Sequence, residues 1–428
     1  MKNLEGLTVA VVGMKRSGVA AVELLRQRGA MVRAIDETPS NGVLPQVLES
    51  FEGVDLVVLS PGVPADLPVI KAVRERVTVI GEVELAFFFL RGRNIGITGS
   101  NGKTTTTALT GHILKESGIP AQVGGNIGLA PTSMVGTSRD GQWNVLELSS
   151  FQLETIVQFV ADIGVCINVT PDHLDRHYTM ENYAAAKGKL FENQKPDGFA
   201  VLNADDAYCV GYAAITAARP LWFSLSHPVA PGLWLDNGTI LFDGDPLIRQ
   251  AEVPLRGLHN IENTMAASAA ARLAGASLDQ ISRAIRTFPG VEHRLEFVRE
   301  RNGVRYYNDS KATNVDATIK ALDSFDGGLW IILGGKDKNS DYGLLTERLQ
   351  RKARGVLLIG AAASIIAGQI GSVVRTISCG TLEAAVELAC RDAVAGDTVL
   401  LSPACASFDQ FENYEHRGNV FKNLVNAL

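Results

Sequence analysis

Residues 99–104 read GSNGKT and have the composition of a loop that holds phosphate. They follow the apolar run NIGIT and precede a threonine-rich segment with the pattern of a helix. Glycines let backbone N–H groups approach phosphate oxygens closely, and the N-terminal end of a helix favours negative charge. A lysine here places a positive charge beside the β- and γ-phosphates, and the hydroxyl after it binds Mg²⁺. We therefore predict a nucleotide-phosphate site at Gly99, Ser100, Asn101, Gly102, Lys103, Thr104 and Thr105.

This loop is a shortened form of the P-loop. The usual pattern has a glycine five residues before Gly102, where this chain has Ile97. A flexible turn with an exposed lysine is the alternative, but strand, loop, Lys-Thr pair and helix all occur in the expected order. By itself the loop fits a switch GTPase, a kinase and a ligase equally well.

A second glycine-containing turn lies near the N-terminus, in VAVVGMKRSG. Gly13 follows a predicted strand, Gly18 opens a predicted helix, and Asp36 ends the next strand, which is half of a dinucleotide-binding fingerprint. Lys15 occupies the place of the second glycine, so a plain strand–helix turn explains the pattern about as well. The pattern is compatible with a nucleotide diphosphate, and it supports NAD poorly.

Several residues in the middle of the chain could bind a metal ion. Glu147 ends an apolar strand, where a carboxylate needs either a cation such as Mg²⁺ or a salt bridge. The segment NVTPDHLDRH could ligate metal, cap a helix or be solvated. Lys187 follows three alanines on a predicted helix, where most lysines are solvated. The clustered polar residues of NVTPDHLDRH are Asp172, His173, Asp175 and His177.

The elements that would position these residues follow a repeated strand–turn–helix order. This order predicts an α/β fold with mostly parallel sheets. Runs such as LTVAVVG, VTVIGEVEL, WNVLELSS and LWIILGGKD are predicted strands, LWLDNGTILF a hairpin, and HNIENTMAASAAARLAG a helix that ends at glycine. A polar break and the FPGVEHRLE segment predict three domains, with residues 1–92, 93–290 and 291–428.

Composition narrows the class of protein. The 428 residues are 46% hydrophobic and 20% charged, with a formal net charge of -6, which argues against broad binding to nucleic acid or anionic membranes. We see no apolar run of membrane-spanning length and no signal-peptide core at the N-terminus, so we expect a cytoplasmic protein. The five cysteines are scattered and form no CxxC pair, which argues against disulfides and a zinc site.

The motifs taken together resemble one family. GSNGKTTT, NVTPDHLDRH, AAAKGKLFEN, LRGLHNIENTMAA, EHRLE, YNDSKATN and LSPACASFDQFENYEHRGNVF occur in order along nearly the whole chain. This sequence resembles the Mur ligases. The last motif is most similar to that of the members that add D-glutamate, and the DNPR motif expected of the diaminopimelate-adding members is absent from the sequence.

The resemblance implies an ATP-dependent ligase of bacterial peptidoglycan synthesis. It would join D-glutamate to UDP-N-acetylmuramoyl-L-alanine through an acyl phosphate, with ATP and Mg²⁺. The implied fold has a Rossmann-like UDP-binding domain, a central P-loop ATPase-like domain and a Rossmann-like C-terminal domain for the amino acid. Small-molecule substrates, a cytoplasmic location and a monomer are expected, with neither nucleic acid nor membrane as a partner.

The resemblance also assigns residues. Lys103, His173, Lys187 and Arg294 would be catalytic; Thr104, Glu147, His173 and Lys187 would hold Mg²⁺, Lys187 as its CO₂-derived carbamate. Asn260, Asn263, Arg294, Asp309 and Lys311 would contact ATP beside the P-loop. The UDP-substrate would meet Gly13, Lys15, Ser17, Gly18, Asp36, Ser60, Gly62 and Asn126. D-Glutamate would meet Thr313, Lys338, Ser407, Phe408 and Tyr414.

Two positions depart from the family pattern. Tyr414 stands where phenylalanine is common, and Thr38 stands where a basic residue sometimes follows Asp36. The alternatives are another Mur step, a folylpolyglutamate-type ligase, a nucleotide-dependent switch protein that makes no bond, and an NAD-linked oxidoreductase. The extra N-terminal α/β unit argues against the folate ligase, and the P-loop argues against the oxidoreductase.

Overall fold

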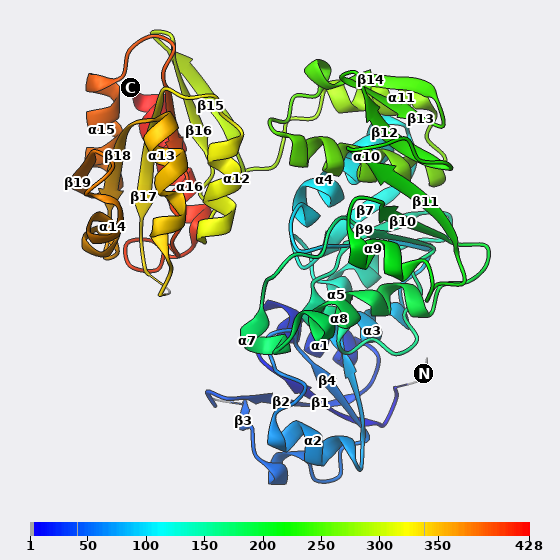
Figure 1. Cartoon of the computed structure of the whole chain (residues 1–428). Helices are drawn as coiled ribbons and strands as arrows, with labels where there is room; N and C mark the ends of the chain where they lie inside the picture. The colour runs from blue at the N-terminus through cyan, green and yellow to red at the C-terminus, as the bar shows by residue number, and fades with distance from the viewer. Residues whose placement is uncertain (1–3, 41, 338) are drawn as a thin grey trace. The chain divides into compact units, whose positions relative to one another are not determined.

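The computed structural model describes residues 4–40, 42–337 and 339–428 (Figure 1). One compact unit runs to Pro254 and includes His259–Phe288; the other consists of Leu255–Leu258 and Pro289–Leu428. Within the described residues the strands form sheets of five, nine and six strands. All three sheets are dominated by parallel pairs and covered by helices, which confirms the predicted α/β class. The predicted domain boundaries at 92 and 291 stay a prediction.

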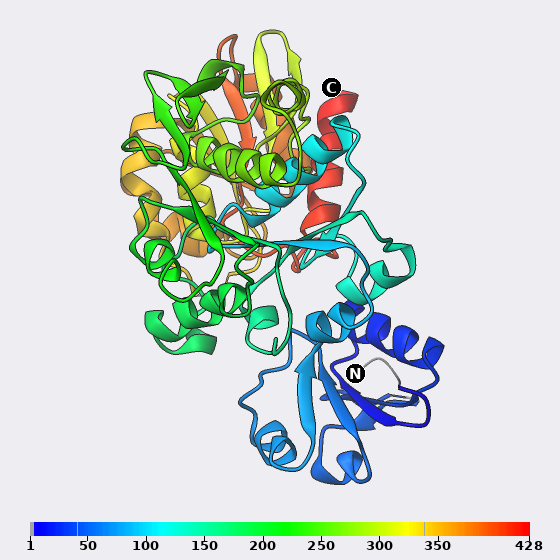
Figure 2. The same cartoon turned by 90° about the vertical axis from the view of Figure 1, so that its right-hand side faces the viewer.

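The first sheet has the order β3-β2-β1-β4-β5 and is parallel throughout. Its strands carry apolar side chains on both faces. One face packs against α1 and the other against α2, as Figures 1 and 2 show. The elements are β1 (Thr8–Val12), α1 (Arg16–Gln27), β2 (Met31–Asp36), β3 (Leu44–Pro45), β4 (Leu56–Leu59), α2 (Pro68–Arg74), β5 (Thr78–Gly81) and α3 (Glu82–Phe87).

One strand prediction is wrong in its second half. The run VTVIGEVEL was predicted as a strand, but β5 ends at Gly81 and the residues after it form α3. The structure gives a reason for the helix. The carboxylate of Glu84 accepts hydrogen bonds from the backbone N–H groups of Val157, Gln158 and Phe159 at 2.8–3.0 Å. A tertiary contact therefore decides the conformation of this segment.

The second sheet has the order β14-β13-β12-β11-β10-β9-β6-β8-β7. Its β6 strand lies between β8 and β9, so the loop after β6 leaves from the interior of the sheet. The strands are β6 (Arg93–Thr98), β7 (Ala121–Gly125), β8 (Trp143–Glu147), β9 (Ile163–Cys166), β10 (Phe199–Asn203), β11 (Arg219–Ser224), β12 (Gly232–Asp236), β13 (Thr239–Phe242) and β14 (Asp245–Arg249). The helices are α4 (Lys103–Glu116), α5 (Pro131–Met134), α6 (Ser150–Leu153), α7 (Leu174–His177), α8 (Met180–Glu192), α9 (Ala207–Tyr212), α10 (Leu258–Leu273) and α11 (Leu278–Arg286).

Two local predictions in this sheet are confirmed. β12 and β13 pair antiparallel across Asn237 and Gly238, both of which have positive φ, as a tight hairpin requires. The alanine-rich segment forms α10, and Gly275 beyond its end has φ +115°. Both predictions rest on residues adjacent in sequence, which is why they hold.

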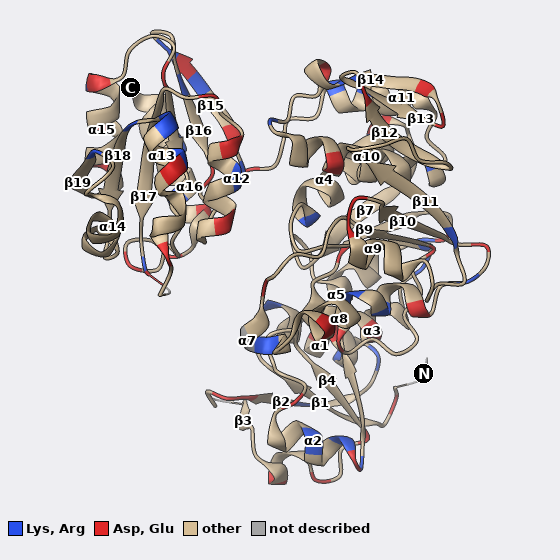
Figure 3. Cartoon of the chain, viewed as in Figure 1, with Lys and Arg blue, Asp and Glu red and all other residues tan. Residues whose placement is uncertain are grey.

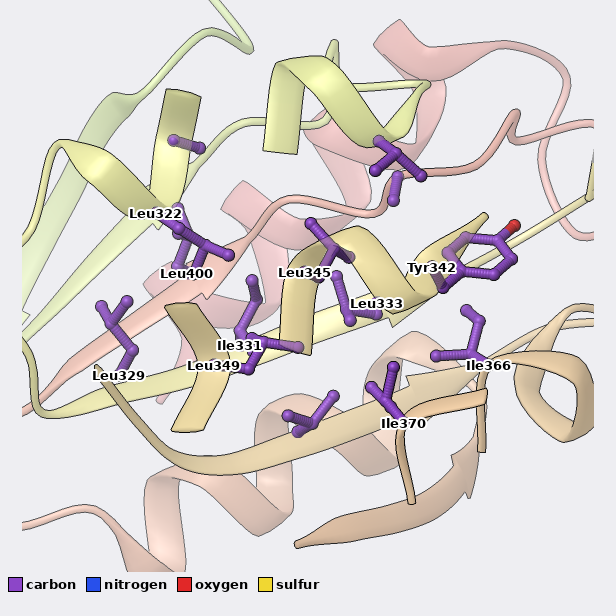
Figure 4. Packing of buried hydrophobic residues seen from close by; sticks show 14 of the residues in the cluster. Leu322, Leu329, Ile331, Leu333, Tyr342, Leu345, Leu349, Ile366, Ile370 and Leu400 are labelled. Atoms are coloured by element: carbon purple, nitrogen blue, oxygen red, sulfur yellow. The ribbon is translucent and has the colours of Figure 1, made fainter. Parts of the chain in front are cut away.

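The third sheet has the order β15-β16-β20-β17-β18-β19, with only the β15/β16 pair antiparallel among the described strands. One face packs leucine and isoleucine side chains against α12, α13 and α14 (Figure 4), and the other packs against α15 and α16. The elements are β15 (Glu296–Arg301), β16 (Val304–Asn308), α12 (Val315–Asp323), β17 (Leu329–Gly334), α13 (Thr346–Lys352), β18 (Ala353–Ile359), α14 (Ala363–Ile370), β19 (Thr376–Gly380), α15 (Leu382–Asp392), β20 (Thr398–Leu401) and α16 (Tyr414–Ala427).

Charged residues of both signs are distributed over both units (Figure 3). Among the described residues, no helix combines the length and the apolar character needed to cross a membrane. The five cysteines are free thiols.

Candidate active site

The predicted phosphate loop connects β6 to α4. Gly102 caps α4 with φ +86°, so its backbone takes a conformation that suits glycine. The Nζ atom of Lys103 donates hydrogen bonds of 2.8 Å to the carbonyl oxygens of Gly99 and Ser100. Thr104 and Thr105 follow in the first turn of α4 and are buried. The lysine therefore folds back over its own loop, where phosphate would lie in a P-loop.

Neighbouring elements hold the loop in place. Asn101 N donates to the side-chain oxygen of Asn168 at 2.9 Å, and Ser100 Oγ donates to the carbonyl of Thr170 at 2.9 Å. The hydroxyl of Tyr183 on α8 donates to Ser100 Oγ at 3.1 Å. These contacts join the ends of β6 and β9, because parallel strands end at the same edge of a sheet. The loop is thus preorganised before any ligand is bound.

Lys187 is buried rather than solvated. Its Nζ donates 2.8 Å to the carbonyl of Gly99 and lies 4.4 Å from the centre of the Tyr183 ring. Burial, and secondarily the positive charge of Lys103, lowers the pKa of Lys187 to about 7. Two lysines therefore meet at one carbonyl oxygen of the phosphate loop, which no ordinary surface helix would require.

Of the two asparagines predicted on the adenine side, Asn263 reaches this loop and Asn260 contacts Asn263. A Cβ atom on Gly102 would collide with the side-chain oxygen of Asn263, so the two residues are in close contact. Thr106 Oγ1 donates to the same oxygen at 3.4 Å, and Asn263 Nδ2 donates to Asn260 Oδ1 at 2.9 Å. The α10 helix therefore packs directly against the start of α4.

Glu147 is buried at the end of β8, and only one of its two carboxylate oxygens accepts a hydrogen bond from the described residues. Its Oε1 accepts a 2.8 Å hydrogen bond from Asn126 Nδ2, while its buried Oε2 has no partner among the described residues. A buried carboxylate oxygen without a partner is costly, and a bound cation would satisfy it. Among the described residues, no group of three or more His, Cys, Asp and Glu side chains is arranged to hold a metal. The predicted set instead combines Glu147 and His173 with a hydroxyl and a modified lysine, so its residue types are compatible with Mg²⁺.

The two histidines of NVTPDHLDRH, His173 and His177, lie in different surroundings. His173 has φ +52°, its side chain is about half exposed, and its ring lies 4.8 Å from that of Phe151. His177 is buried, with ring nitrogens 2.9 Å from Ser150 Oγ and 3.3 Å from Glu154 Oε1. Burial lowers the pKa of His177. His177 therefore packs inside the unit, while His173 is accessible. Asp172 contacts His173, with 3.6 Å between Oδ2 and Nε2.

A cavity of about 840 Å³ opens at the carboxyl edge of the first sheet. This volume is within the range of small-molecule sites. Gly125 at the end of β7, Asn126 directly after it and Gln152 on α6 also contribute to its wall. Seven residues predicted for the UDP-substrate line it: Gly13, Lys15, Ser17, Asp36, Ser60, Gly62 and Asn126.

Gly18, the eighth residue predicted for the UDP-substrate, does not line the cavity but allows tight packing of the turn between β1 and α1. A Cβ on Gly18 would overlap the carbonyl of Gly13, so the glycine allows α1 to approach β1 closely. Asp36 accepts hydrogen bonds from the backbone N–H groups of Met14 at 2.6 Å and Thr38 at 3.0 Å, which lower the pKa of its carboxyl. Asp36 therefore orders the turn that forms the cavity floor as well as lining the cavity.

Sequence reasoning missed Arg16 and Arg176. The Arg16 guanidinium lines the cavity and donates to the carbonyl of Asn126 at 3.3 Å. The Arg176 guanidinium donates to Glu154 at 2.8 Å and to the carbonyl of Val63 in the cavity wall at 3.3 Å. An arginine among polar residues usually indicates a solvated side chain, and the sequence carries no local sign of these long-range contacts.

The carboxyl edge of the third sheet carries the remaining predicted residues. Asp309 is buried; its Oδ2 accepts from Ser402 Oγ at 2.8 Å, and burial raises the pKa of its carboxyl to about 7. Arg294 Nε is buried with no hydrogen-bond partner among the described residues. Lys311 Nζ lies 5.8 Å from the centre of the Tyr414 ring.

Three D-glutamate candidates differ in burial. Ser407 is buried, Thr313 is partly buried, and the ring-bearing Phe408 is 68% exposed. Lys338 lies outside the described residues. Thr313, Ser407 and Phe408, with Arg294, Asp309, Lys311 and Tyr414, belong to the second compact unit, whereas the phosphate loop belongs to the first. Their meeting around one ATP and one amino acid stays a prediction.

Comparison with known proteins agrees with the resemblance seen in the motifs. Residues 97–271 match the family described as "Mur ligase middle domain", and residues 293–405 match "Mur ligase, glutamate ligase domain". A protein of Solibacter usitatus named UDP-N-acetylmuramoylalanine–D-glutamate ligase is 58% identical over 99% of both chains. The chain belongs to the Mur ligase family. A relative with the same name from Acidobacterium capsulatum is 49% identical over 99% of this chain and 97% of its own.

Solved structures show the same Mur ligase fold at much lower identity. MurC of Thermotoga maritima aligns over 98% of this chain and 99% of its own, with a TM-score of 0.64 and 18% identity. MurF of Thermotoga maritima, solved in complex with ADP, aligns over 99% and 96%, with a TM-score of 0.63 and 18% identity. At this identity the likeness supports the fold alone.

Proposed function

We propose that this Mur ligase joins D-glutamate to UDP-N-acetylmuramoyl-L-alanine, with ATP, in the synthesis of peptidoglycan precursors. Full-length relatives that carry this activity in their names are 58% and 49% identical to the chain. The observation that carries the proposal is the phosphate loop. Lys103 and Lys187 both contact the Gly99 carbonyl, so the charge of Lys103 and a lysine that can lose its proton lie together where the ATP phosphates would bind.

The chemistry explains why such charge is needed. A carboxylate does not react with an amine at neutral pH because its leaving group would be oxide. Transfer of the γ-phosphoryl group of ATP to the carboxylate gives an acyl phosphate and ADP. The amine of D-glutamate then attacks the acyl carbon, loses a proton, and displaces phosphate. Negative charge develops on phosphoryl and acyl oxygens in both steps, and fixed cations stabilise it.

We assign these roles to the chain's own residues. Residues of the loop from Gly99 to Thr105 bind the ATP phosphates, with Asn260 and Asn263 beside the nucleotide. Lys103 and Arg294 stabilise the transferring phosphoryl group. The UDP-substrate occupies the cavity of about 840 Å³, whose ligand-facing wall includes Lys15, Arg16 and Asn126.

Mg²⁺ would be held by Thr104, Glu147, His173 and modified Lys187. The buried, unpartnered Oε2 of Glu147 supports this assignment, because an oxygen ligand without a hydrogen bond is what a dication needs. The metal would neutralise charge on the ATP phosphates. Asn126 joins the metal residues to the substrate cavity through its 2.8 Å hydrogen bond to Glu147.

The carbamate on Lys187 is part of the proposal. A neutral amine attacks CO₂ to form an N–C bond and releases one proton, which leaves an anionic carbamate. The lowered pKa of Lys187, about 7, makes the neutral amine available near neutral pH. Carbamylation would convert a cation into an anionic oxygen ligand and remove the repulsion between Lys187 and Lys103.

The three sheets suggest three domains with separate tasks. We assign the Rossmann-like segment 1–92 to the UDP-substrate, the P-loop segment 93–290 to ATP, and the Rossmann-like segment 291–428 to D-glutamate. Thr313, Lys338, Ser407, Phe408 and Tyr414 would bind the amino acid, and Asp309 and Lys311 would approach the nucleotide. Closure of the domains would exclude water, which otherwise hydrolyses the acyl phosphate. A cytoplasmic monomer is the state we expect.

Phosphate release tests the proposal directly. Purified protein is mixed with ATP, Mg²⁺ and UDP-N-acetylmuramoyl-L-alanine, and a panel of amino acids is added one at a time. We expect release with D-glutamate and not with L-glutamate, L-lysine or diaminopimelate. Release with another amino acid alone would reassign the chain within the family, and release without any amino acid would indicate a nucleotide-dependent switch protein.

The same assay tests the role of Lys103 through the variant Lys103→Ala, with Lys115→Ala as its matched control. We expect turnover to fall more than about 1,000-fold, because the charge beside the phosphates is lost. The melting temperature should stay within about 2 °C, because the two hydrogen bonds from Lys103 Nζ go to backbone carbonyls of the phosphate loop rather than to the apolar core. Lys115→Ala, an exposed lysine at the other end of α4, should keep wild-type turnover. Turnover of Lys103→Ala equal to that of Lys115→Ala would refute a phosphate-binding role.

A further inference from the structure

Three loops meet at the carboxyl edge of the third sheet. They follow β16, β17 and β20, three neighbouring strands of that sheet. The first loop contains Ser310, the second begins at Gly335, and the third contains Cys405 and Ala406. The residues proposed to bind D-glutamate, and two of those proposed for ATP, lie on these loops or directly after them. Whatever fixes the three loops against one another therefore also fixes the proposed amino-acid site.

The side chain of Arg417 lies between the three loops. It enters from the first turn of α16 and is fully buried. Its Nε donates to Ser310 Oγ at 3.0 Å, and one terminal nitrogen donates to the carbonyls of Ser310 at 2.9 Å and Cys405 at 3.2 Å. The other terminal nitrogen donates to the carbonyls of Gly334 and Ala406, both at 3.5 Å. One guanidinium group thus contacts the loops after β16 and β20 and the carbonyl of Gly334, the last residue of β17, from which the second loop starts.

This arrangement differs from an ordinary buried ion pair. Within the described part of the chain, no carboxylate forms a salt bridge with Arg417, and all its acceptors are carbonyl oxygens or a hydroxyl. Burial lowers its pKa to about 10, so the group stays charged near neutral pH. A planar guanidinium offers five N–H donors in fixed directions, whereas a lysine ammonium offers three at a single atom. The site therefore uses the shape of arginine as well as its charge.

The loops that Arg417 contacts are in demanding conformations. Ala404 has φ +59°, a left-handed conformation that is unfavourable for a residue with a Cβ. Gly335 has φ +139°, and a Cβ there would overlap the carbonyl of Ala406. Lys336 N donates to that same carbonyl at 2.8 Å. Such conformations persist only where surrounding contacts hold them, and they cluster at functional sites.

We propose that Arg417 is a positioning residue that holds these three loops in the one arrangement that binds the acceptor amino acid. This inference rests on the proposed function. Arg417 does not touch the substrate: its donors are all used by the loops, which carry Thr313, Ser407 and Phe408 to their places. Removing the guanidinium lets each loop relax independently, so the groups that bind the acceptor amino acid no longer converge on it.

Steady-state kinetics of the full-length enzyme test this role. Arg417→Met removes the charge, and Arg417→Lys keeps it but loses the planar fork. We expect kcat/KM for D-glutamate to fall about 100-fold in Arg417→Met, as misplacement by about 1 Å can cost this much. Most of the loss should be a higher KM for D-glutamate, while the KM for UDP-N-acetylmuramoyl-L-alanine stays within about twofold. Arg417→Lys should have a kcat/KM for D-glutamate only slightly higher than that of Arg417→Met.

Phe421→Leu is the matched control for loss of stability. Phe421 is fully buried on the same helix one turn later, in the apolar cluster that α15 and α16 form with the sheet, and it takes no part in the hydrogen bonds of Arg417. It should lower the melting temperature without raising the KM for D-glutamate. Ser310→Ala is a milder second variant, because it keeps the guanidinium and its bonds to the carbonyl oxygens. It removes the acceptor of Arg417 Nε and the 2.8 Å hydrogen bond from Ser310 Oγ to the carbonyl of Tyr414, and we expect about a threefold higher KM from this smaller disturbance.

Hydrogen exchange gives a readout that does not depend on activity. In Arg417→Met and Ser310→Ala, peptides covering 309–314 and 402–413 should exchange faster, and those of β18 and β19 should not change. Wild-type exchange in both loops, or an unchanged KM for D-glutamate in both variants, would overturn the inference. The inference would also be overturned if Phe421→Leu raised the KM for D-glutamate as much as Arg417→Met does. Failure of wild-type enzyme to use D-glutamate would instead refute the proposed function, while the exchange result would still decide the role of Arg417.

Discussion

Lys187 and Arg417 are both buried cations whose nitrogens donate to backbone carbonyl oxygens, but they stand at the edges of two different sheets. Lys187 makes a single bond to the phosphate loop, and its lowered pKa of about 7 allows it to lose its proton. Arg417 makes five bonds and keeps its charge, with a pKa of about 10. Lysine suits a place where a cation must change chemically, and arginine suits one where it must only hold loops together.

Between these two cations, the larger effect is expected from fixing the charge at position 187. Lys187→Arg cannot form a carbamate and places a permanent cation beside Lys103, so turnover should fall about 1,000-fold. Lys187→Ala should lose a similar amount, but a short carboxylic acid or added bicarbonate should restore part of it by supplying an anionic oxygen. Rates are measured with and without the additive. Lys189→Ala, on the same helix, is the control and should retain most of its activity.

Full activity of Lys187→Arg without an additive would contradict the difference proposed between Lys187, which changes chemically, and Arg417, which keeps its charge. It would mean that position 187 needs only a positive charge. The carbamate assignment would then fail, although the P-loop assignment would not.

Gly335→Ala addresses the other edge and should have the next largest effect. The added Cβ would overlap the carbonyl of Ala406, and φ +139° is unfavourable for alanine. We expect a loss of about 2–3 kcal/mol in the free energy of unfolding of this unit. Gly380→Ala has a similarly positive φ of +74° but open space around it, and should cost only about 1 kcal/mol.

Denaturant unfolding measures both variants, and the KM for D-glutamate is measured in parallel. A higher KM in Gly335→Ala and not in Gly380→Ala would connect the close approach to substrate binding. Equal losses of stability in the two variants would show that backbone conformation, rather than contact with Ala406, decides the cost.

A smaller effect is expected from Glu82, a buried group that should change its protonation state. Burial raises the pKa of its carboxyl to about 7, although Thr132 N and Oγ1 both donate to it. In the unfolded chain this carboxyl ionises near its ordinary value of 4.5. Between these two values the folded state binds more protons than the unfolded state, so stability should fall as the pH rises from 5 to 8.

Glu82→Gln should remove this dependence. We expect the stability loss between pH 5 and pH 8 to be on the order of 2 kcal/mol smaller in Glu82→Gln than in wild type. Chemical unfolding at several pH values measures the slope for each protein. Identical slopes would show that Glu82 is charged in the folded state at both pH values.

The parts of the fold that were predicted from sequence depend on neighbouring residues. The phosphate loop and the hairpin at Asn237-Gly238 are encoded in consecutive positions with particular backbone needs. The strand prediction for VTVIGEVEL failed because the alternation of valine and leucine also fits a helix. Hydrogen bonds from residues 157–159 to Glu84 decide between the two, and they lie more than 70 positions away.

The site shows the same division. Seven of the predicted UDP-substrate residues line one cavity. They could be predicted because glycines and polar residues directly after strands mark the carboxyl edge of a parallel sheet, where such folds bind ligands. Arg176 and Arg417 were not predicted. Their surroundings are built from carbonyl oxygens and side chains of distant segments, and neither hydrophobic periodicity nor residue type reveals a buried arginine. The burial of Lys187 was likewise invisible in the sequence without the family resemblance.

Arg176 also bears on how tightly the cavity can bind its ligand. Its guanidinium fixes the Val63 carbonyl of the cavity wall, pairs with Glu154, and lies 4.5 Å from the centre of the Phe151 ring. The wall is therefore ordered before the UDP-substrate that we propose for this cavity would bind. Ordering a flexible side chain on association costs about 0.5–1.5 kcal/mol. A wall that is rigid beforehand avoids this entropic loss, so more of the contact energy is expressed as affinity.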